Sequence, residues 1–492
     1  FQKQLNGYFL TQKTIKMKTK NLEDLINYKG TILIPVFETN EKSLVPIEFH
    51  GVSVTSKVFY GKKDTQYLVE KYDCLHVFIG LGKEIDYKNI KTIFRRIAHK
   101  NKIIFGKEVA LFLPDNLSTS QIEATLSGLK LGTYDLGHYK KSAVHSFLEN
   151  DFELGIVCKN DYSAAVLKGI KIANAQLEVL KMVDLPPNAV TPKFLSDWAL
   201  ESGKKYGFTT EIFDREASKI NRLDAFLAVG KGSEKEPQFV IMNYVPLNVN
   251  PKTKHIGLVG KGITFDTGGL NIKVAGMVQM KCDMAGGAAV FGAMQLIADL
   301  KLDVKVTAIV PCCENSVDSK SFLPSDVITC YSGSSIEIID TDAEGRLILA
   351  DGLSYLIKNF KPEIIVDIAT LTGSSVGTFG YECGALFTNN DIISKKLQEA
   401  GNEIGERLWQ LPLWDCYKSD IESEIADVKN YSGKPVAGAI SAAKFLEFFT
   451  EKHTAWAHLD IAGVAFGDDE FAKTKHATAY GVHLLTKFIE NC

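Results

Sequence analysis

The sequence has no long run of lysine and arginine, and neither sign of charge dominates it. Its 56 basic residues face 59 acidic residues, so the formal net charge is only −3. Nucleic-acid phosphates usually bind a clustered cationic surface. The composition therefore gives no electrostatic reason to expect a nucleic-acid partner, and nucleic-acid binding stays a minority alternative.

Long apolar runs are absent as well. The longest weakly polar stretch, AGGAAVFGAMQLIA at residues 285–298, contains Gln295. It is shorter than the roughly 20 apolar residues that a membrane-spanning helix needs. We therefore expect a soluble globular chain without a membrane partner.

Cysteines with the spacing of a disulfide framework or a zinc motif are missing. The nine cysteines are scattered along the chain, no CxxC pair occurs, and only Cys312 and Cys313 are adjacent. An odd, scattered set favours a reducing compartment, so we expect a cytoplasmic location.

Two common site motifs are absent too. Among the ten histidines no HExxH pair occurs, and there is no GxxxxGK[ST] phosphate loop. Gly260 and Gly262 resemble the start of a GxGxxG loop, but Phe265 stands where that loop requires its third glycine. Nucleotide binding is therefore set aside.

The first 22 residues carry five lysines and no acidic residue. Transit peptides are typically amphipathic and rich in arginine, whereas this segment has no arginine and no apolar secretory core. We expect residues 1–22 to be a leader or a disordered segment.

The remaining chain, at 492 residues and 45% hydrophobic content, is long enough for two domains. Residues 76–132 alternate apolar runs with helical patterns, which is typical of an α/β unit. Apolar residues spaced three and four apart then predict a helix from Val166 that stops before Pro186. We predict an N-terminal α/β domain over residues 1–163, a linker helix over 164–185 and a larger C-terminal domain over 186–492.

The C-terminal domain alternates apolar strands with helices. KHIGLVGKGITF, DVKVTAIVP, SIEII and EIIVDIATL are strand-like runs, and AGGAAVFGAMQLIADL and EGRLILADGLSYLIKNF are helical. This order predicts the α/β class, with a mixed, largely parallel sheet flanked by helices. Ligands of such sheets tend to bind outside the carboxyl ends of the strands.

Two charged clusters lie where an apolar strand gives way to a turn. In DTDAEGR the side chains of Asp342, Glu344 and Arg346 recur at every second position, so an extended backbone would present them on one side. Asp340 also falls in this series of alternate positions. A second cluster, in GKGITFDTGGLNIK and MKCD, supplies Lys261, Asp266, Lys273 and Asp283.

Four carboxylates converging in one cleft would repel one another unless cations compensate them. Two divalent ions would supply that charge, and oxygen-rich sites bind zinc, manganese or magnesium. Taken singly, an acid such as Asp283 is better explained as a helix cap or an ion-pair partner. His458, alone among apolar neighbours, is best explained as a hydrogen-bonded core histidine.

The two clusters resemble the signatures of a known family. DTDAEGRL is similar to the NTDAEGRL signature of the leucyl aminopeptidases, the dinuclear-metal cytosol aminopeptidase family, and GKGITFDTGG resembles the family's other metal-binding segment. DLPPNAVTP, DIATLTG, GAISAAKFLEFF and HLDIAG extend the resemblance over approximately residues 165–492. The resemblance implies that the C-terminal domain is catalytic.

The resemblance also implies a role for each charged residue. Asp266 and Glu344 would bridge two metal ions, Asp342 would complete the shell of one ion, and Lys261 and Asp283 that of the other. A lysine ligates only as a neutral amine, so the pKa of Lys261 would be strongly lowered by the adjacent dications. Zinc is the first expectation for both sites, with manganese or cobalt as alternatives.

Catalysis would depend on two further residues. Lys273 would polarise the scissile carbonyl or stabilise its oxyanion. Arg346 would hold a bicarbonate ion that acts as general base towards a metal-activated water. The resemblance thus implies an exopeptidase that removes Leu-like N-terminal residues from peptides and dipeptides, assembled as a homohexamer.

The family's pocket for the first substrate residue maps onto small, mostly apolar positions: Met280, Thr370, Leu371, Gly373, Ala462 and Ala465. Such a lining favours a Leu or Met side chain and leaves a charged one poorly solvated. For Ala462 and Ala465 a plain core position is nearly as good an explanation.

The sequence departs from the family pattern at two places. The segment between Lys273 and Asp283 is one residue shorter, and Asp340 stands where the signature usually has asparagine. Two alternatives to an active aminopeptidase remain open: a catalytically silent structural homologue, and an additional nucleic-acid-binding role.

Overall fold

The computed structural model describes residues 16–20, 22–25, 28–40, 45–101, 105–106, 108–140, 153–468 and 470–492. The chain divides into two compact units, Phe1–Asn174 and Ala175–Cys492. The divide falls inside the long helix α4 (Ser163–Asp184), the helix that the sequence predicts as a linker.

The N-terminal unit is built on a six-stranded sheet in the order β1-β8-β7-β2-β6-β5. Only the hairpin partner β5 runs antiparallel to its neighbour. The strands are β1 (Lys16–Lys20), β2 (Thr31–Phe37), β5 (Gln66–Lys71), β6 (Cys74–Gly82), β7 (Glu108–Phe112) and β8 (Glu153–Val157). The other elements that the structure describes in this unit are η1 (Leu22–Leu25), α2 (Tyr87–Lys100), α3 (Thr119–Leu131) and the hairpin of β3 (Ile47–Phe49) and β4 (Val52–Val54).

Part of the expected leader belongs to this sheet. Residues 1–15 lie outside the described residues, but Lys16–Lys20 form β1, which pairs in parallel with β8. The backbone groups of these five residues therefore pair with an edge of β8, and the leader expected for residues 1–22 stays a prediction.

The C-terminal unit is built on a nine-stranded mixed sheet, with the order β18-β17-β20-β16-β11-β13-β10-β9 and with β12 paired to β13. Its centre is parallel, since β11 pairs in parallel with both β13 and β16, and β16 with β20. The strands are β9 (Thr209–Phe213), β10 (Gln238–Tyr244), β11 (His255–Gly260), β12 (Gly262–Asp266), β13 (Lys305–Asn315), β16 (Ile364–Ala369), β17 (Gly384–Thr388), β18 (Leu408–Gln410) and β20 (Trp456–Asp460).

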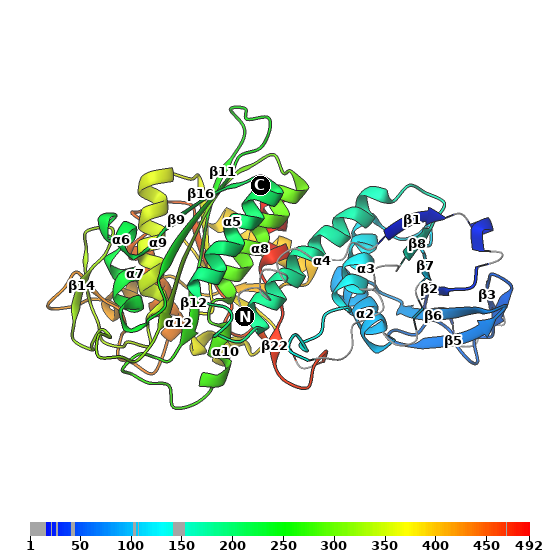
Figure 1. Ribbon diagram of the computed structural model, residues 1–492, viewed down its shortest axis with the longest axis horizontal. Helices are drawn as coiled ribbons and strands as arrows, with labels where there is room; N and C mark the ends of the chain where they lie inside the picture. The colour runs from blue at the N-terminus through cyan, green and yellow to red at the C-terminus, as the bar shows by residue number, and fades with distance from the viewer. Residues whose placement is uncertain are drawn as a thin grey trace. The chain divides into compact units, whose positions relative to one another are not determined.

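Helices cover both faces of this sheet (Figure 1). On one face lie α5 (Pro192–Tyr206), α8 (Ala285–Leu300) and α13 (Val482–Glu490), and on the other lie α7 (Asp224–Val229), α9 (Gly345–Phe360) and α12 (Gly438–Phe448). The remaining helical elements are α6 (Arg215–Ile220), η3 (Gly230–Gly232), η4 (Met277–Cys282), α10 (Gly373–Phe379), α11 (Asp391–Ile404) and η5 (Asp415–Asp420). The predicted α/β class with a mixed, largely parallel sheet is confirmed.

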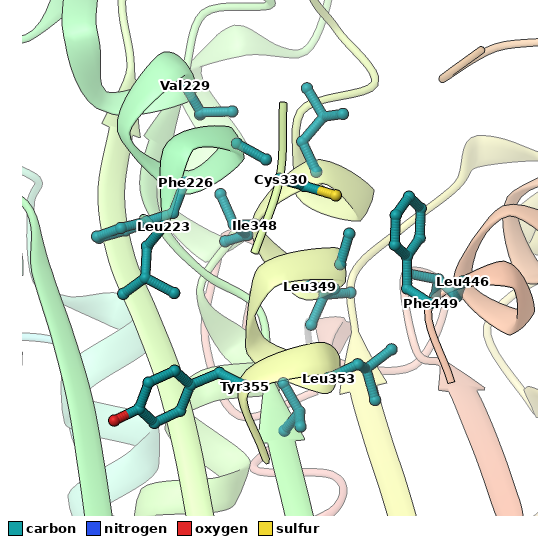
Figure 2. Packing of buried hydrophobic residues seen from close by; sticks show 14 of the residues in the cluster. Leu223, Phe226, Val229, Cys330, Ile348, Leu349, Leu353, Tyr355, Leu446 and Phe449 are labelled. Carbon is teal, nitrogen blue, oxygen red and sulfur yellow. The ribbon is translucent and has the colours of Figure 1, made fainter. Parts of the chain in front are cut away.

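The core on the α9 face shows why this helix forms where it does. Ile348, Leu349 and Leu353 of α9 are fully buried, and Figure 2 shows them between Phe226 of α7 and Phe449 after α12. Burying an aliphatic side chain of this size contributes about 1.5–3 kcal/mol. Packing of this face therefore anchors α9, whose first turn faces the site described below.

One predicted strand belongs to a different sheet. SIEII forms only the short β15 (Ser335–Glu337), which lies in a three-stranded sheet between β14 (Val327–Thr329) and β19 (Val428–Lys429). Ile338 is buried but lies outside the strand. The prediction that these residues form a strand of the main sheet is wrong, because an apolar run indicates that a segment is buried but not which sheet it joins.

A further hairpin joins β21 (Phe466–Asp468) and β22 (His476–Ala477).

None of the helices given above combines the length and the apolar character that a membrane crossing needs.

Candidate metal centre

The predicted site residues gather at the carboxyl ends of the parallel strands in the C-terminal unit. Lys261 stands at the break between β11 and β12, and Asp266 is the last residue of β12. Thr370 directly follows β16. All three side chains are buried and line one cleft of about 1030 Å³. The site therefore lies where ligands of parallel sheets usually bind.

Asp283 reaches the cleft because α8 packs very closely on the sheet. A Cβ atom added at Gly286 would lie 2.2 Å from the carbonyl oxygen of Ile368 in β16. Only glycine allows that approach, which brings Asp283, two residues before α8, against the strand ends. The Thr370 hydroxyl donates to Oδ1 of Asp283 at 2.9 Å.

Asp342, Glu344 and Arg346 enter the site from a turn and the start of a helix. Asp342 lies in the turn, Glu344 has helical backbone angles and Arg346 belongs to the first turn of α9. The predicted extended presentation is wrong, because a helix begins at Gly345. The three side chains still reach one cleft.

Lys261 joins two of the carboxylates. Its Nζ atom lies 2.8 Å from Oδ2 of Asp283 and 2.9 Å from Oε1 of Glu344, and it donates to the Thr370 carbonyl at 3.0 Å. A Cβ atom added at Gly345 would lie 2.6 Å from the same Nζ. Glycine at this helix start is thus what allows the ammonium group to reach Glu344.

Lys273 joins the other two carboxylates. Its Nζ atom lies 2.7 Å from Oδ2 of Asp266 and 2.5 Å from Oδ1 of Asp342. Lys273 is the more accessible lysine, with 17% of its side chain exposed against 4% for Lys261. Each pair of acids is therefore held together by one ammonium group.

The pKa values of the lysines reflect a surplus of negative charge. Burial alone lowers the pKa of Lys261, but Asp283, Glu344 and Asp266 more than reverse this and raise it above its ordinary value. Burial also lowers the pKa of Lys273, but the charges of Asp266 and Glu344 outweigh burial and raise that pKa above its ordinary value. The lowered pKa expected for Lys261 depends on bound dications and stays a prediction.

The pKa values of the acids are raised by burial and by the same surplus of negative charge. Burial, followed by the charge of Asp266, raises the pKa of Glu344. Burial and the charges of Asp266 and Glu344 raise the pKa of Asp342 to about 7. Burial also raises the pKa of Asp283 well above its ordinary range. The cleft therefore favours additional positive charge.

The donor set fits divalent cations. Carboxylate oxygens of Asp266, Asp342 and Glu344 lie within 4.8 Å of one another. Oε2 of Glu344 is buried and accepts no hydrogen bond from any described residue. A buried carboxylate oxygen without a partner is costly, and a divalent cation bound by oxygen ligands would remove that cost.

The predicted first-residue pocket is only partly assembled. The cleft is lined by Met280, Thr370, Leu371, Gly373 and Ala462. Ala465 is not among the lining residues and is only 3% exposed. Its assignment to the pocket stays a prediction.

Asp340, to which the sequence assigned no task, has a structural one. Its Oδ1 atom accepts a hydrogen bond from the backbone N–H of Asp342 at 2.8 Å. This contact, typical of aspartate in a turn, fixes the chain next to a cluster acid. Asp340 also lines the cleft.

Two asparagines that the sequence analysis did not identify form hydrogen bonds to the acids or to the chain beside them. Asn315 donates from Nδ2 to Oδ1 of Asp266 at 2.8 Å and to the carbonyl of Thr341 at 3.0 Å. Asn430 donates to the carbonyl of Asp340 at 2.7 Å. Neither lies in a recognisable motif, and both act across many residues of sequence, so pattern reasoning had no signal for them.

His458 is a core histidine, as predicted. It is fully buried, and its Nδ1 atom lies 2.5 Å from Oδ1 of Asp367. The other oxygen of Asp367 accepts from Nε1 of Trp456 at 2.7 Å. The ring stacks on Phe387 and does not line the cleft.

The fold and the site together define an α/β protein in which a cluster of carboxylates suited to divalent cations lies at the carboxyl ends of parallel strands. The model of the cytosol aminopeptidase family, catalytic domain, matches residues 179–486. The chain belongs to this family of metallo-exopeptidases, as the resemblance in its sequence predicted.

Individual relatives agree with this assignment. The chain is 41% identical to the probable cytosol aminopeptidase of Chlorobaculum tepidum over 77% of this chain and 76% of that protein. The chain is 40% identical to the probable cytosol aminopeptidase of Chloroherpeton thalassium over 84% of this chain and 85% of that protein. The match to the Chlorobaculum parvum protein has 44% identity and spans 66% of this chain and 64% of that relative's length.

A solved structure shares most of the fold. The bottromycin maturation enzyme BotP in complex with Mn superposes with a TM-score of 0.83, at 26% identity, over 94% of this chain and 99% of that one. The similarity therefore includes the N-terminal third, where the sequence resemblance was limited to general α/β character.

Proposed function

We propose that this protein is a metal-dependent aminopeptidase that releases Leu-like N-terminal residues from peptides and dipeptides. The observation that carries the proposal is the convergence of carboxylate oxygens from Asp266, Asp342 and Glu344 within 4.8 Å of one another. They lie in a cleft large enough for a peptide end. Family membership supports the same reaction class.

Two divalent ions are the proposed cofactors. Asp266 and Glu344 would contact both ions, Asp342 would contact one, and Lys261 with Asp283 would contact the other. Bound there, the ions would polarise the scissile carbonyl and acidify a water molecule. Zinc remains our first choice and manganese or cobalt the alternatives; the manganese complex of BotP supports a divalent ion in this fold.

Lys273 supplies a positive charge that the reaction requires. Its ammonium group now lies between Asp266 and Asp342. Ligation of metal by these two acids would release the ammonium group towards the cleft, which Lys273 lines. There it would stabilise negative charge on the carbonyl oxygen of the substrate.

Arg346 is the proposed holder of bicarbonate. Its guanidinium group is almost completely buried, lines the cleft and has an Nε atom without a hydrogen-bond partner among the described residues. An anion that accepts from such a group forms charge-assisted hydrogen bonds. Bicarbonate held there would take the proton from the attacking water, a task for which no histidine lines the cleft.

Substrate choice would follow from the cleft. Asp283 would receive the free α-amine of the substrate, a group that an internal peptide bond lacks. Met280, Gly373 and Ala462 would surround the first side chain, and their apolar lining disfavours a charged residue.

The assembly and the location rest on the family resemblance. We propose a homohexamer in the cytoplasm, with peptides as the only other partners. A catalytically silent homologue would be expected to have lost metal ligands, yet all five proposed ligands are present in the sequence. Within the part of the chain that the structure describes, no feature supports nucleic-acid binding as the acid cluster supports metal binding.

The proposed function is tested with a panel of chromogenic aminoacyl substrates, each assayed with zinc, manganese, cobalt or no added metal. We expect hydrolysis of Leu and Met substrates and little hydrolysis of Asp or Lys substrates. Absence of hydrolysis with every metal would overturn the proposal.

A further inference from the structure

Asn430 connects the segment that carries the acids to the side chain of Arg346. It directly follows β19, is fully buried, and its backbone N–H donates to the carbonyl of Glu337 at 2.9 Å. This contact continues the parallel pairing of β15 and β19. The backbone of Asn430 is therefore anchored before its side chain makes any contact.

The side-chain amide of Asn430 holds the chain immediately before Asp342. Its Oδ1 atom accepts from the N–H of Ile339 at 2.8 Å and from that of Asp340 at 3.3 Å. Its Nδ2 atom donates to the carbonyl of Asp340 at 2.7 Å. One amide thus satisfies both backbone groups of Asp340, whose carboxylate in turn caps the N–H of Asp342.

The main-chain carbonyl of Asn430 holds Arg346. It accepts a hydrogen bond from Nη1 at 2.7 Å. In the described part of the chain this is the only hydrogen-bond partner of the guanidinium group. The direction in which the remaining N–H groups of Arg346 point is therefore set by where the carbonyl of Asn430 stands.

We propose that Asn430 is a positioning residue for the reaction: it aligns the guanidinium group of Arg346 with the segment that carries Asp342 and Glu344. This inference rests on the proposed function, because alignment matters only if Arg346 and the acids act on one substrate. Asn430 itself is not among the residues that line the cleft. Small displacements of such groups cost much activity.

A purely structural role predicts a different result. A buried asparagine that only stabilises the fold would, when replaced, lower activity by the same factor whether or not Arg346 is present. Asn430→Ala removes the side-chain amide that holds Ile339 and Asp340 but keeps the main-chain carbonyl that holds Arg346, so it lets this segment shift relative to the guanidinium group. If that alignment is what Asn430 provides, the variant loses most of its effect once Arg346 is absent. A double-mutant cycle separates these two cases.

The experiment compares Asn430→Ala, Arg346→Ala and the double variant in the full-length, metal-loaded protein. We expect Asn430→Ala to lower kcat by about 10- to 100-fold, the range typical of residues that orient catalytic ligands, and to lower it less than about threefold in the Arg346→Ala background. Equal losses in both backgrounds would overturn the proposal.

Asn390→Ala is the matched control. Its side chain also accepts two backbone N–H groups, those of Ile392 and Ile393, and donates to a backbone carbonyl, but it does not line the cleft. We expect its kcat to be unchanged. If Asn430→Ala does not fold, Asn430→Asp keeps the volume and replaces the donor to Asp340 by an acceptor, so the same cycle can be measured with it.

Amide hydrogen exchange provides a readout that needs no activity. We expect the Ile339 and Asp340 amides to exchange at least about tenfold faster in the Asn430 variant and the Ile392 and Ile393 amides to be unchanged. If the wild-type protein hydrolyses no substrate, the proposed function fails, whereas unchanged exchange at Ile339 and Asp340 would show that Asn430 does not hold this segment and would overturn the positioning role by itself.

Discussion

The Nζ atom of Lys261 lies 2.9 Å from Oε1 of Glu344, while Oε2 of the same carboxylate is buried without a hydrogen bond from any residue that the structure describes. One oxygen is thus neutralised by the protein and the other is left for a cation. The bridging role proposed for Glu344 further requires that Lys261 give up Oε1 to the second ion, which Lys261 would itself bind as a neutral amine.

Glu344→Gln is expected to lower activity by at least about 100-fold and to reduce the metal content to one ion per chain or none. Loss of residues that only orient ligands already costs about 10- to 100-fold, and an amide is a poorer ligand than a carboxylate. Metal content is measured by elemental analysis after gel filtration. Glu337→Gln, outside the cleft, should retain both; two ions and normal turnover in Glu344→Gln would refute the bridging role.

Arg346→Ala is expected to slow turnover by about 100- to 1000-fold, the usual effect of removing one group that stabilises charge, and to leave the metal content unchanged. The proposed contact of Arg346 is with bicarbonate. The dependence of kcat on added bicarbonate should therefore disappear in the variant. Parallel loss of metal and activity would assign Arg346 to the metal shell instead.

Gly373→Val is expected to raise KM for Leu substrates by about tenfold or more and to affect Ala substrates much less. A Cβ atom added at Gly373 meets no atom within 4 Å, so the new side chain fits and occupies the cleft. Gly106→Val, also in open space but in the N-terminal unit, is the control. Equal changes for Leu and Ala substrates would place the first side chain elsewhere.

Asp351 should make stability depend on pH. Its carboxylate is fully buried and accepts from the N–H groups of Phe226 and Tyr331 at 2.8 and 2.7 Å. Burial raises its pKa to about 7, so the folded state binds the proton more tightly than the unfolded state. The stabilisation is complete below about pH 4 and is lost as the pH rises through 7.

The measurement compares urea unfolding of the wild-type protein and Asp351→Asn at pH 5 and pH 8. Tryptophan fluorescence follows the C-terminal unit alone, because the 4 tryptophans all lie within it. We expect the wild-type free energy of unfolding to fall by about 2–3 kcal/mol relative to the variant between these pH values. Identical pH dependence of the two proteins would show that Asp351 does not titrate in this range.

Much of the fold could be predicted because its elements are long and uniformly apolar. AGGAAVFGAMQLIADL forms α8 and EIIVDIATL contains β16, since burial on all sides leaves few alternatives. The run before Asp340 failed because Ile338 is buried beside a different, smaller sheet. Which sheet buries an apolar residue is a property of the tertiary structure.

The site could be predicted as a set of charges but not as a geometry. Lys261, Asp266, Asp283, Asp342 and Glu344 do converge, whereas the alternation of Asp342 and Glu344 implied an extended chain that does not exist. Asn430 could not be found, because its hydrogen bonds to Ile339 and Asp340 cross 91 and 90 residues of sequence. Contacts of that span depend on the finished fold.

The most direct test of the central claim is removal and return of metal in an assay that measures release of free leucine from Leu-Gly-Gly. Chelation should abolish release, and return of zinc, manganese or cobalt should restore it, with N-acetylated Leu-Gly-Gly left uncleaved because it lacks the free amine. Leucine release that persists without metal, or cleavage of the acetylated peptide at the same rate, would contradict a metal-dependent aminopeptidase.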